Sequence, residues 1–299
     1  MKRIFSTAII VLLMNLGSIL QLQAQNIIAA NEHPVLVSSD YSFTEGPATD
    51  ANGNVYFTDQ PNNRIIKWAV DGTASVFMEP CGRSNGLYFD RDGKLLACAD
   101  EQNQLWSIDV TTKEHTVILT DFEGKLLNAP NDLWIAPQGG IYFTDPFYKR
   151  PYWDDSTRTA IKENVYYISP DRKSIKVVEQ DVVKPNGIIG TPDGKLLYVA
   201  DIGDSKTYSY KIKKDGSLSK RKLFCEMGSD GMTLDNQGNV YLTGKGVTVF
   251  NSKGEKIEHI PIEQGWTANV TFGGKNNDVL FITAMNSVYT VKMNVKGAN

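Results

Sequence analysis

The hydrophobic pattern of this chain is a series of short apolar runs, each of which follows a turn. The clearest runs are NVYFTD, KLLACAD, GIYFTD, KLLYVAD, NVYLTG and DVLFIT. Between them lie further short runs rich in Val, Ile, Tyr, Phe and Leu, bounded by Asn-Gly, Asp-Gly or Gln-Gly pairs. Such runs predict short antiparallel strands joined by hairpins, whereas helical periodicity is weak throughout. The chain is therefore expected to be all-β.

The spacing of the turns predicts a closed ring of repeats. The turns stand 40, 46, 55, 44 and 39 residues apart, a period typical of repeat architectures. In the first repeat we expect four strands, at 46–48, 55–58, 64–68 and 74–78. Six such units predict a six-bladed β-propeller. The last unit has only three strands, so residues 34–38 are expected to add its fourth and close the ring.

One polar position recurs in every repeat, eight residues before the turn, and only carboxylate or amide side chains occupy it. The inner strands of the blades should begin around one mouth of the central channel, so these six groups are expected to converge there. Clustered carboxylates repel one another, and calcium would offset the repulsion because it accepts carboxylate and amide oxygens together. The six residues are Glu45, Asn85, Asn131, Asn186, Asp230 and Asn269.

Three other interpretations of these sequence features compete with the metal site. Asn-Gly and Asp-Gly pairs form turns, so turn chemistry alone could explain part of the pattern. A zinc site is disfavoured because the three histidines, His33, His115 and His259, stand in unrelated registers. The segment 82–86 matches the G-x-S-x-G motif of serine hydrolases, but a strand and a hairpin follow it where that motif needs a helix.

Two further features are expected near the same mouth. Aspartates end the second strands, and Asp59, Asp145 and Asp201 among them could hold a second calcium ion. The longest repeat carries an aromatic insertion at 146–155, which could form a lid or pack its own aromatic rings on the surface. Tyr152 and Trp153 of this insertion are candidate substrate contacts.

Composition narrows the possible partners and the compartment. The net charge of −3 and the pI of about 5.7 argue against a nucleic-acid partner. A short basic start, an apolar run over 4–20 and a small residue at Ala24 predict a signal peptide at 1–24. A propeller domain at 25–299 would then be periplasmic or secreted, without a membrane anchor. Cys81 and Cys98 could form one disulfide or remain two buried thiols.

Several segments resemble the gluconolactonase/regucalcin family, and the resemblance covers nearly the whole expected domain. It implies a six-bladed propeller with a divalent cation, commonly calcium, in its channel. Glu45, Asn186 and Asp230 would be the protein ligands, with Asn131 as a further ligand or substrate contact. The common register, rather than the resemblance, adds Asn85 as a substrate contact. The matching segments are 44–47, 124–133, 142–146, 185–188, 229–232 and 269–274.

The resemblance implies a calcium-dependent hydrolase that opens a sugar-type lactone. Asp230 would also be the general base, which takes a proton from the attacking water and passes it to the leaving ring oxygen. Two positions depart from the family pattern: Ala129 replaces an arginine, and Asp100-Glu101 stands where many bacterial relatives have a histidine. Hydrolysis of another ester or of a phosphotriester, and a non-catalytic calcium-stabilised binding propeller, remain alternatives. The particular lactone and the oligomeric state stay open.

Overall fold

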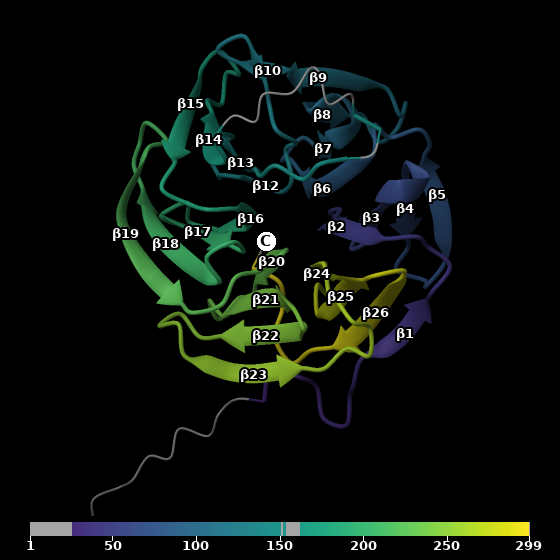
Figure 1. Cartoon of the computed structure of the whole chain (residues 1–299). Coiled ribbons are helices and arrows are strands. Elements are labelled where there is room, and N and C mark those ends of the chain that lie inside the picture. Colours follow the sequence, from purple (N-terminus) through teal and green to yellow (C-terminus); the bar gives the residue numbers. More distant parts are fainter. Residues whose placement is uncertain (1–25, 151, 154–161, 299) are drawn as a thin grey trace, which may run out of the picture.

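Six four-stranded antiparallel sheets surround a central axis in the computed structural model, which describes residues 26–150, 152–153 and 162–298 (Figure 1). The predicted six-bladed β-propeller is confirmed. The innermost strand of each blade lies nearest the axis, and the C-terminus also lies close to it (Figure 1). The predicted signal peptide lies outside the described residues, so export stays a prediction.

The first three blades follow one another along the chain, each running from the axis outward. Blade 1 contains β2 (Thr44–Thr49), β3 (Val55–Asp59), β4 (Arg64–Trp68) and β5 (Ala74–Met78). Blade 2 contains β6 (Ser84–Phe89), β7 (Leu95–Ala99), β8 (Gln104–Ile108) and β9 (His115–Leu119). Blade 3 contains β12 (Leu133–Ile135), β13 (Ile141–Asp145), β14 (Asn164–Ile168) and β15 (Ile175–Glu179).

The other three blades repeat this order. Blade 4 contains β16 (Pro185–Gly190), β17 (Leu196–Asp201), β18 (Lys206–Ile212) and β19 (Leu218–Cys225). Blade 5 contains β20 (Met232–Leu234), β21 (Val240–Gly244), β22 (Gly246–Phe250) and β23 (Lys256–Ile260). Blade 6 contains β24 (Asn269–Gly273), β25 (Val279–Ala284), β26 (Ser287–Lys292) and β1 (Val35–Ser38). Short elements connect some strands: η1 (Gln60–Asn62), η2 (Asp100–Gln102) and the hairpin of β10 (Asp121–Phe122) with β11 (Lys125–Leu126).

The ring closes where the start of the chain meets its end. Strand β1 pairs antiparallel with β26, with Val35 opposite Thr290 and Leu36 opposite Tyr289. The expected closure by residues 34–38 is therefore confirmed. It supplies the outer strand of blade 6 from the N-terminal side of blade 1, so the last blade joins the ring through backbone hydrogen bonds.

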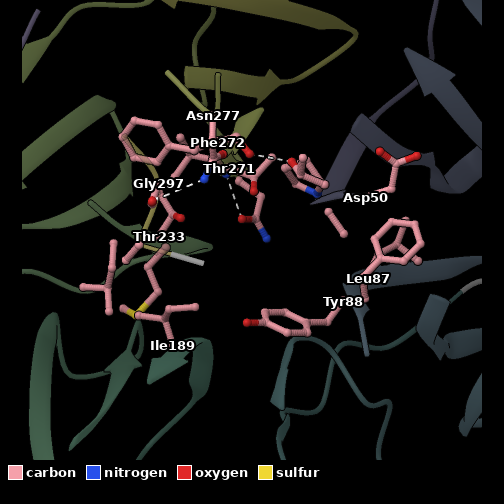
Figure 2. A pocket seen from close by; sticks show the side chains of 18 of the residues that line it. Asp50, Leu87, Tyr88, Ile189, Thr233, Thr271, Phe272, Asn277 and Gly297 are labelled. Atoms are coloured by element: carbon pink, nitrogen blue, oxygen red, sulfur yellow. Dashed lines mark hydrogen bonds between the residues drawn. The ribbon is translucent and has the colours of Figure 1, made fainter. Parts of the chain in front are cut away.

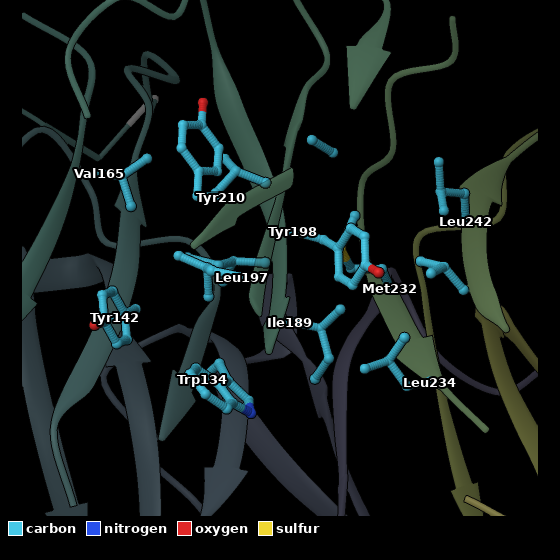
Figure 3. Packing of buried hydrophobic residues seen from close by; sticks show 14 of the residues in the cluster. Trp134, Tyr142, Val165, Ile189, Leu197, Tyr198, Tyr210, Met232, Leu234 and Leu242 are labelled. Carbon is cyan, nitrogen blue, oxygen red and sulfur yellow. The ribbon is translucent and has the colours of Figure 1, made fainter. Parts of the chain in front are cut away.

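The core lies between neighbouring blades. Every residue of the second strands β3, β7, β13 and β21 is buried, because each sheet is packed on both faces by adjacent sheets. This explains why these strands read as continuous apolar runs rather than alternating ones. One cluster joins Trp134 and Tyr142 of blade 3 to Leu197 of blade 4 and Leu234 of blade 5 (Figure 3).

Two smaller points concern cysteines and membranes. Cys81, Cys98 and Cys225 are buried free thiols, so the alternative of two unpaired thiols at Cys81 and Cys98 is the correct one. No helix among the described residues has the length and apolarity needed to cross a bilayer.

Candidate active site

Irregular strand starts present the recurring polar residues to the axis. Glu45, Asn85 and Asn186 are the second residues of β2, β6 and β16, so these strands begin slightly earlier than the sequence predicted. In all three blades the pairing register with the next strand shifts within the three residues that follow. Such bulges re-aim a side chain out of the regular alternation. The shifts thus turn these polar groups away from the normal pleat.

Glycines after the polar residues let neighbouring blades approach each other. A Cβ atom on Gly46 would collide with the carbonyl group of Asn85, and one on Gly231 with the side chain of Asn269. The pairs Asn85-Gly86 and Asn186-Gly187 lie inside β6 and β16, not in turns. Turn chemistry alone is therefore the wrong explanation, and the glycines serve close packing around the axis.

Asp230 and Asn186 are hydrogen-bonded to each other and to two aromatic side chains. Nδ2 of Asn186 donates to Oδ1 of Asp230 at 2.8 Å and to the hydroxyl of Tyr148 at 3.0 Å. Nε1 of Trp266 donates to Oδ2 of Asp230 at 2.6 Å. Both oxygens of the proposed base are thus oriented by fixed donors. Tyr148 and Trp266 were not predicted as site residues: Tyr148 lies in the aromatic insertion, whereas Trp266 carries no sequence signal.

The two carboxyl groups of the site disfavour each other's ionisation. Burial, and then the charge of Asp230, raise the pKa of Glu45 well above its usual range. Burial also raises the pKa of Asp230 to about 6, although hydrogen bonds from Trp266 and Asn186 and the charge of Arg150 oppose the shift. Two buried carboxylates that must both be ionised need a compensating positive charge.

The donor set fits a hard cation. Oδ1 of Asn186 is buried and has no hydrogen-bond partner among the described residues, an arrangement that is costly unless a ligand satisfies it. Together with Glu45 and Asp230 it offers only oxygen atoms, the ligands that calcium prefers. Within the described ranges no three His, Cys, Asp or Glu side chains cluster as a metal site, because this set includes an amide.

The other three members of the ring divide into two groups. Asn85 and Asn131 are buried, and the backbone carbonyl of Asn131 accepts the N–H of Gly86 at 2.8 Å. The side chain of Asn269 instead donates to Asp132, which belongs to blade 3 on the opposite side of the ring. Asp132 is a buried carboxyl group that was not predicted as a site residue. Burial raises its pKa to about 8.

A cavity of about 340 Å³ lies on the far side of this contact (Figure 2). Tyr88, Thr233 and Asn277 line it together with Asp132 and Asn269, whereas Glu45, Asn186 and Asp230 do not. Gly297 also lines it, and Nδ2 of Asn277 donates to the backbone carbonyl of Gly297 at 3.2 Å (Figure 2). The candidate site therefore faces the other end of the propeller.

The described part of the aromatic insertion, residues 146–150 and 152–153, contacts the site, whereas residues 151, 154 and 155 lie outside the described residues. Besides Tyr148, it brings Arg150 into an ion pair with Asp100 at 2.6 Å. The guanidinium of Arg83 lies 4.6 Å above the ring of Tyr152. Trp153 packs against Phe147, with ring centroids 6.2 Å apart. The two interpretations of the insertion are thus compatible: Trp153 packs within the segment, and Tyr148 reaches the site.

The outer aspartates have a structural role. Asp59, Asp145 and Asp201 are buried, and each accepts two backbone N–H groups from the segment that leads into the inner strand of its own blade. Their oxygens are thus already bonded, which leaves the hypothesis of a second calcium without support. The paired donors are Ser42 and Phe43, Asn128 and Ala129, and Val183 and Lys184.

Fold and site together define a class: a six-bladed propeller with an all-oxygen site suited to a hard cation at one mouth of its channel. The chain belongs to the SMP-30/Gluconolactonase/LRE-like family, whose sequence profile matches residues 43–286. The family resemblance seen in the sequence is thereby confirmed.

Similarity to individual proteins supports the membership of this family. The chain is 29% identical to the gluconolactonase of Zymomonas mobilis, over 88% of this chain and 82% of that protein. It is also 29% identical to the lactonase drp35 of Staphylococcus saprophyticus, over 82% and 78% of the two chains. Among solved structures, the gluconolactonase XC5397 of Xanthomonas campestris superposes with a TM-score of 0.82 at 27% identity, over 89% of this chain and 91% of that one.

Proposed function

We propose that this chain is a calcium-dependent hydrolase that opens a sugar-type lactone. The observation that carries the proposal is the buried, partnerless Oδ1 of Asn186 beside two carboxyl groups that disfavour each other's ionisation. The gluconolactonase and lactonase relatives support the reaction class. Glu45, Asn186 and Asp230 would hold the cation, with Asn131 as a further ligand or substrate contact.

Asp230 would act as the general base. It takes a proton from the water whose oxygen attacks the lactone carbonyl carbon. As the bond between that carbon and the ring oxygen breaks, the same proton passes to the leaving oxygen, which gives the open hydroxy acid. The hydrogen bonds from Trp266 and Asn186 hold the carboxylate in one orientation, as a general base requires.

The remaining residues would bind and orient the lactone. Bound calcium would supply positive charge that stabilises the oxyanion developing on the lactone carbonyl. Asn85, Asn131, Tyr152 and Trp153 would be the contacts to the lactone. Tyr148 keeps the Asn186 amide in place and thereby fixes which of its atoms faces the cation.

A proton-release assay tests the proposal. The protein with residues 25–299 is mixed with glucono-δ-lactone, with phenyl acetate and with a phosphotriester, as purified, after chelation and after calcium is restored. Lactone turnover that chelation abolishes and calcium restores is the expected result. Turnover of the ester or the phosphotriester alone would move the substrate class to the alternative hydrolases. Tight calcium binding without turnover of any substrate would favour a binding propeller.

A further inference from the structure

Asp100 departs from the structural role of its equivalents in other blades. In blades 1, 3 and 4 the aspartate that ends the second strand accepts backbone N–H groups of the incoming segment. In blade 2 the N–H group of Arg83, which corresponds to one of these donors, donates instead to Oδ1 of Asn63 at 2.7 Å, and the N–H group of Cys81 donates to the same oxygen at 3.0 Å. Asn63 has therefore taken over the loop contact, and the carboxylate of Asp100 has a different set of partners.

Those partners lie at the mouth of the site. Oδ2 of Asp100 accepts Nε of Arg150 at 2.6 Å and Nε2 of Gln60 at 3.0 Å, and Nη2 of Arg150 lies at 2.6 Å. The hydroxyl of Tyr152 also hydrogen-bonds with this carboxyl group. The Asp100 side chain is 1% exposed and that of Arg150 is 21% exposed. A buried carboxylate thus fixes one edge of a guanidinium whose remainder is partly open to solvent.

Arg150 is close to the reacting groups. Tyr148, two residues earlier in the same insertion, contacts Asn186 directly. The guanidinium carbon of Arg150 lies 5.7 Å from the centroid of the Tyr148 ring. The guanidinium therefore lies beside the residue that contacts Asn186, although it comes from blade 3 and its anchor from blade 2.

The chemistry of the guanidinium indicates what it can bind. It offers five N–H donors and no acceptor, and its Nε and Nη2 edge is occupied by Asp100. Ring hydroxyl groups of a sugar present oxygen lone pairs that such donors can reach. A site that hydrogen-bonds substrate hydroxyls discriminates strongly against an analogue that lacks them, because its polar groups are then left unpaired.

We propose that Arg150, positioned by Asp100, donates hydrogen bonds to ring hydroxyl groups of a polyhydroxylated lactone and so selects sugar lactones over lactones without hydroxyls. The inference rests on the proposed function and names a residue that determines its substrate class. Arg150 is the binding residue, and Asp100 acts through it as a positioning residue.

The test compares two lactones with the same ring size, glucono-δ-lactone and δ-valerolactone. Arg150→Met should lower kcat/KM for glucono-δ-lactone by about 10- to 100-fold, mainly through KM, and change it less than about threefold for δ-valerolactone. Asp100→Asn should raise KM for the sugar lactone less strongly. Lys149→Met removes an exposed positive charge from the neighbouring position. It should leave kcat/KM unchanged for both lactones. Equal losses on both lactones in Arg150→Met would overturn the proposal.

A binding measurement keeps this test separate from the test of the proposed function. Gluconate and 5-hydroxyvalerate are titrated by calorimetry into the wild type and into Arg150→Met. The wild type should bind gluconate strongly and 5-hydroxyvalerate weakly, and the variant should lose the strong gluconate binding. Wild type that turns over neither lactone would refute the proposed function, yet gluconate binding would still decide the role of Arg150. Failure of wild type to bind gluconate would overturn that role too. Melting temperatures accompany each variant, and if Arg150→Met unfolds, the double variant Asp100→Asn/Arg150→Met removes the buried charge as well.

Discussion

Two sets of carboxyl groups lie towards the same end of the propeller and behave differently. The outer aspartates, such as Asp145 and Asp201, each accept two or more backbone N–H groups within their own blade. The inner pair, Glu45 and Asp230, lies between blades, and the neighbouring Asn186 keeps an oxygen without a partner. Fixed backbone donors satisfy a structural carboxylate, whereas incomplete satisfaction leaves an oxygen available for a ligand.

Asp100 shows that the boundary between the two sets is not fixed by position in the blade. It stands directly after β7, as Asp201 ends β17, and it is equally buried. Because Asn63 accepts the N–H groups of its loop, Asp100 is paired with Arg150 at the mouth instead. A change of hydrogen-bond partner thus gives a carboxylate at this position in the blade a contact at the mouth of the site, where its equivalents hold their own loops.

The largest effect is expected for the inner set. Asp230→Asn should lower kcat for lactone hydrolysis by a factor of about 1,000 or more, because the base is lost while the hydrogen bonds around it can partly remain. Glu45→Gln should instead weaken calcium binding, measured by calorimetry, and reduce activity at limiting calcium. Asp201→Ala serves as the control for both variants, since it removes an outer carboxylate. Full activity in Asp230→Asn would show that another group is the base.

An intermediate effect is expected for the outer set. Asp201→Ala leaves the backbone N–H groups of Val183 and Lys184 without their acceptor, which should lower the free energy of unfolding by about 1 to 3 kcal/mol. The kcat/KM of the folded variant should stay within about twofold of wild type. Urea denaturation with and without calcium measures the free energy of unfolding, and initial rates measure kcat/KM. Loss of calcium affinity without loss of stability would place Asp201 in the inner set and break the comparison.

The smallest effect concerns pH and Asp145. Burial raises its pKa in the folded protein to about 7, against the opposing hydrogen bonds from Asn128 and Ala129, whereas an unfolded aspartate titrates near about 3.9. The folded state thus holds the extra proton between about pH 4 and 7, and its contribution to stability is lost as pH rises through this window.

Asp145→Asn removes that titration. The variant should be closer to wild type in stability at pH 7.5 than at pH 4.5, by about 1 to 3 kcal/mol, as measured by urea denaturation at the two values. A difference between the two proteins that does not change with pH would contradict this account. Asp201→Asn, measured in parallel, shows how far the response is specific to Asp145.

Much of the architecture followed from local patterns. Turn residues and apolar runs are short-range signals, so strands such as β4 and β5 were predicted with the bounds that the structure has, and β3 to within one residue. The closure by β1 followed from counting the strands of the last repeat. The convergence of Glu45, Asn186 and Asp230 followed from their common register, because a ring of identical blades brings equivalent positions together.

The sequence by itself therefore determined the propeller, the number of blades and the polar register around its axis, since a repeat carries the same information in every copy. Only the tertiary structure decided how each polar group is satisfied. Trp266 on Asp230 and Asn269 across the axis on Asp132 are contacts between segments that no repeat relates. The partner of a hydrogen bond depends on distances across the folded chain, and those distances separate the carboxylates that hold loops from the ones left for a ligand.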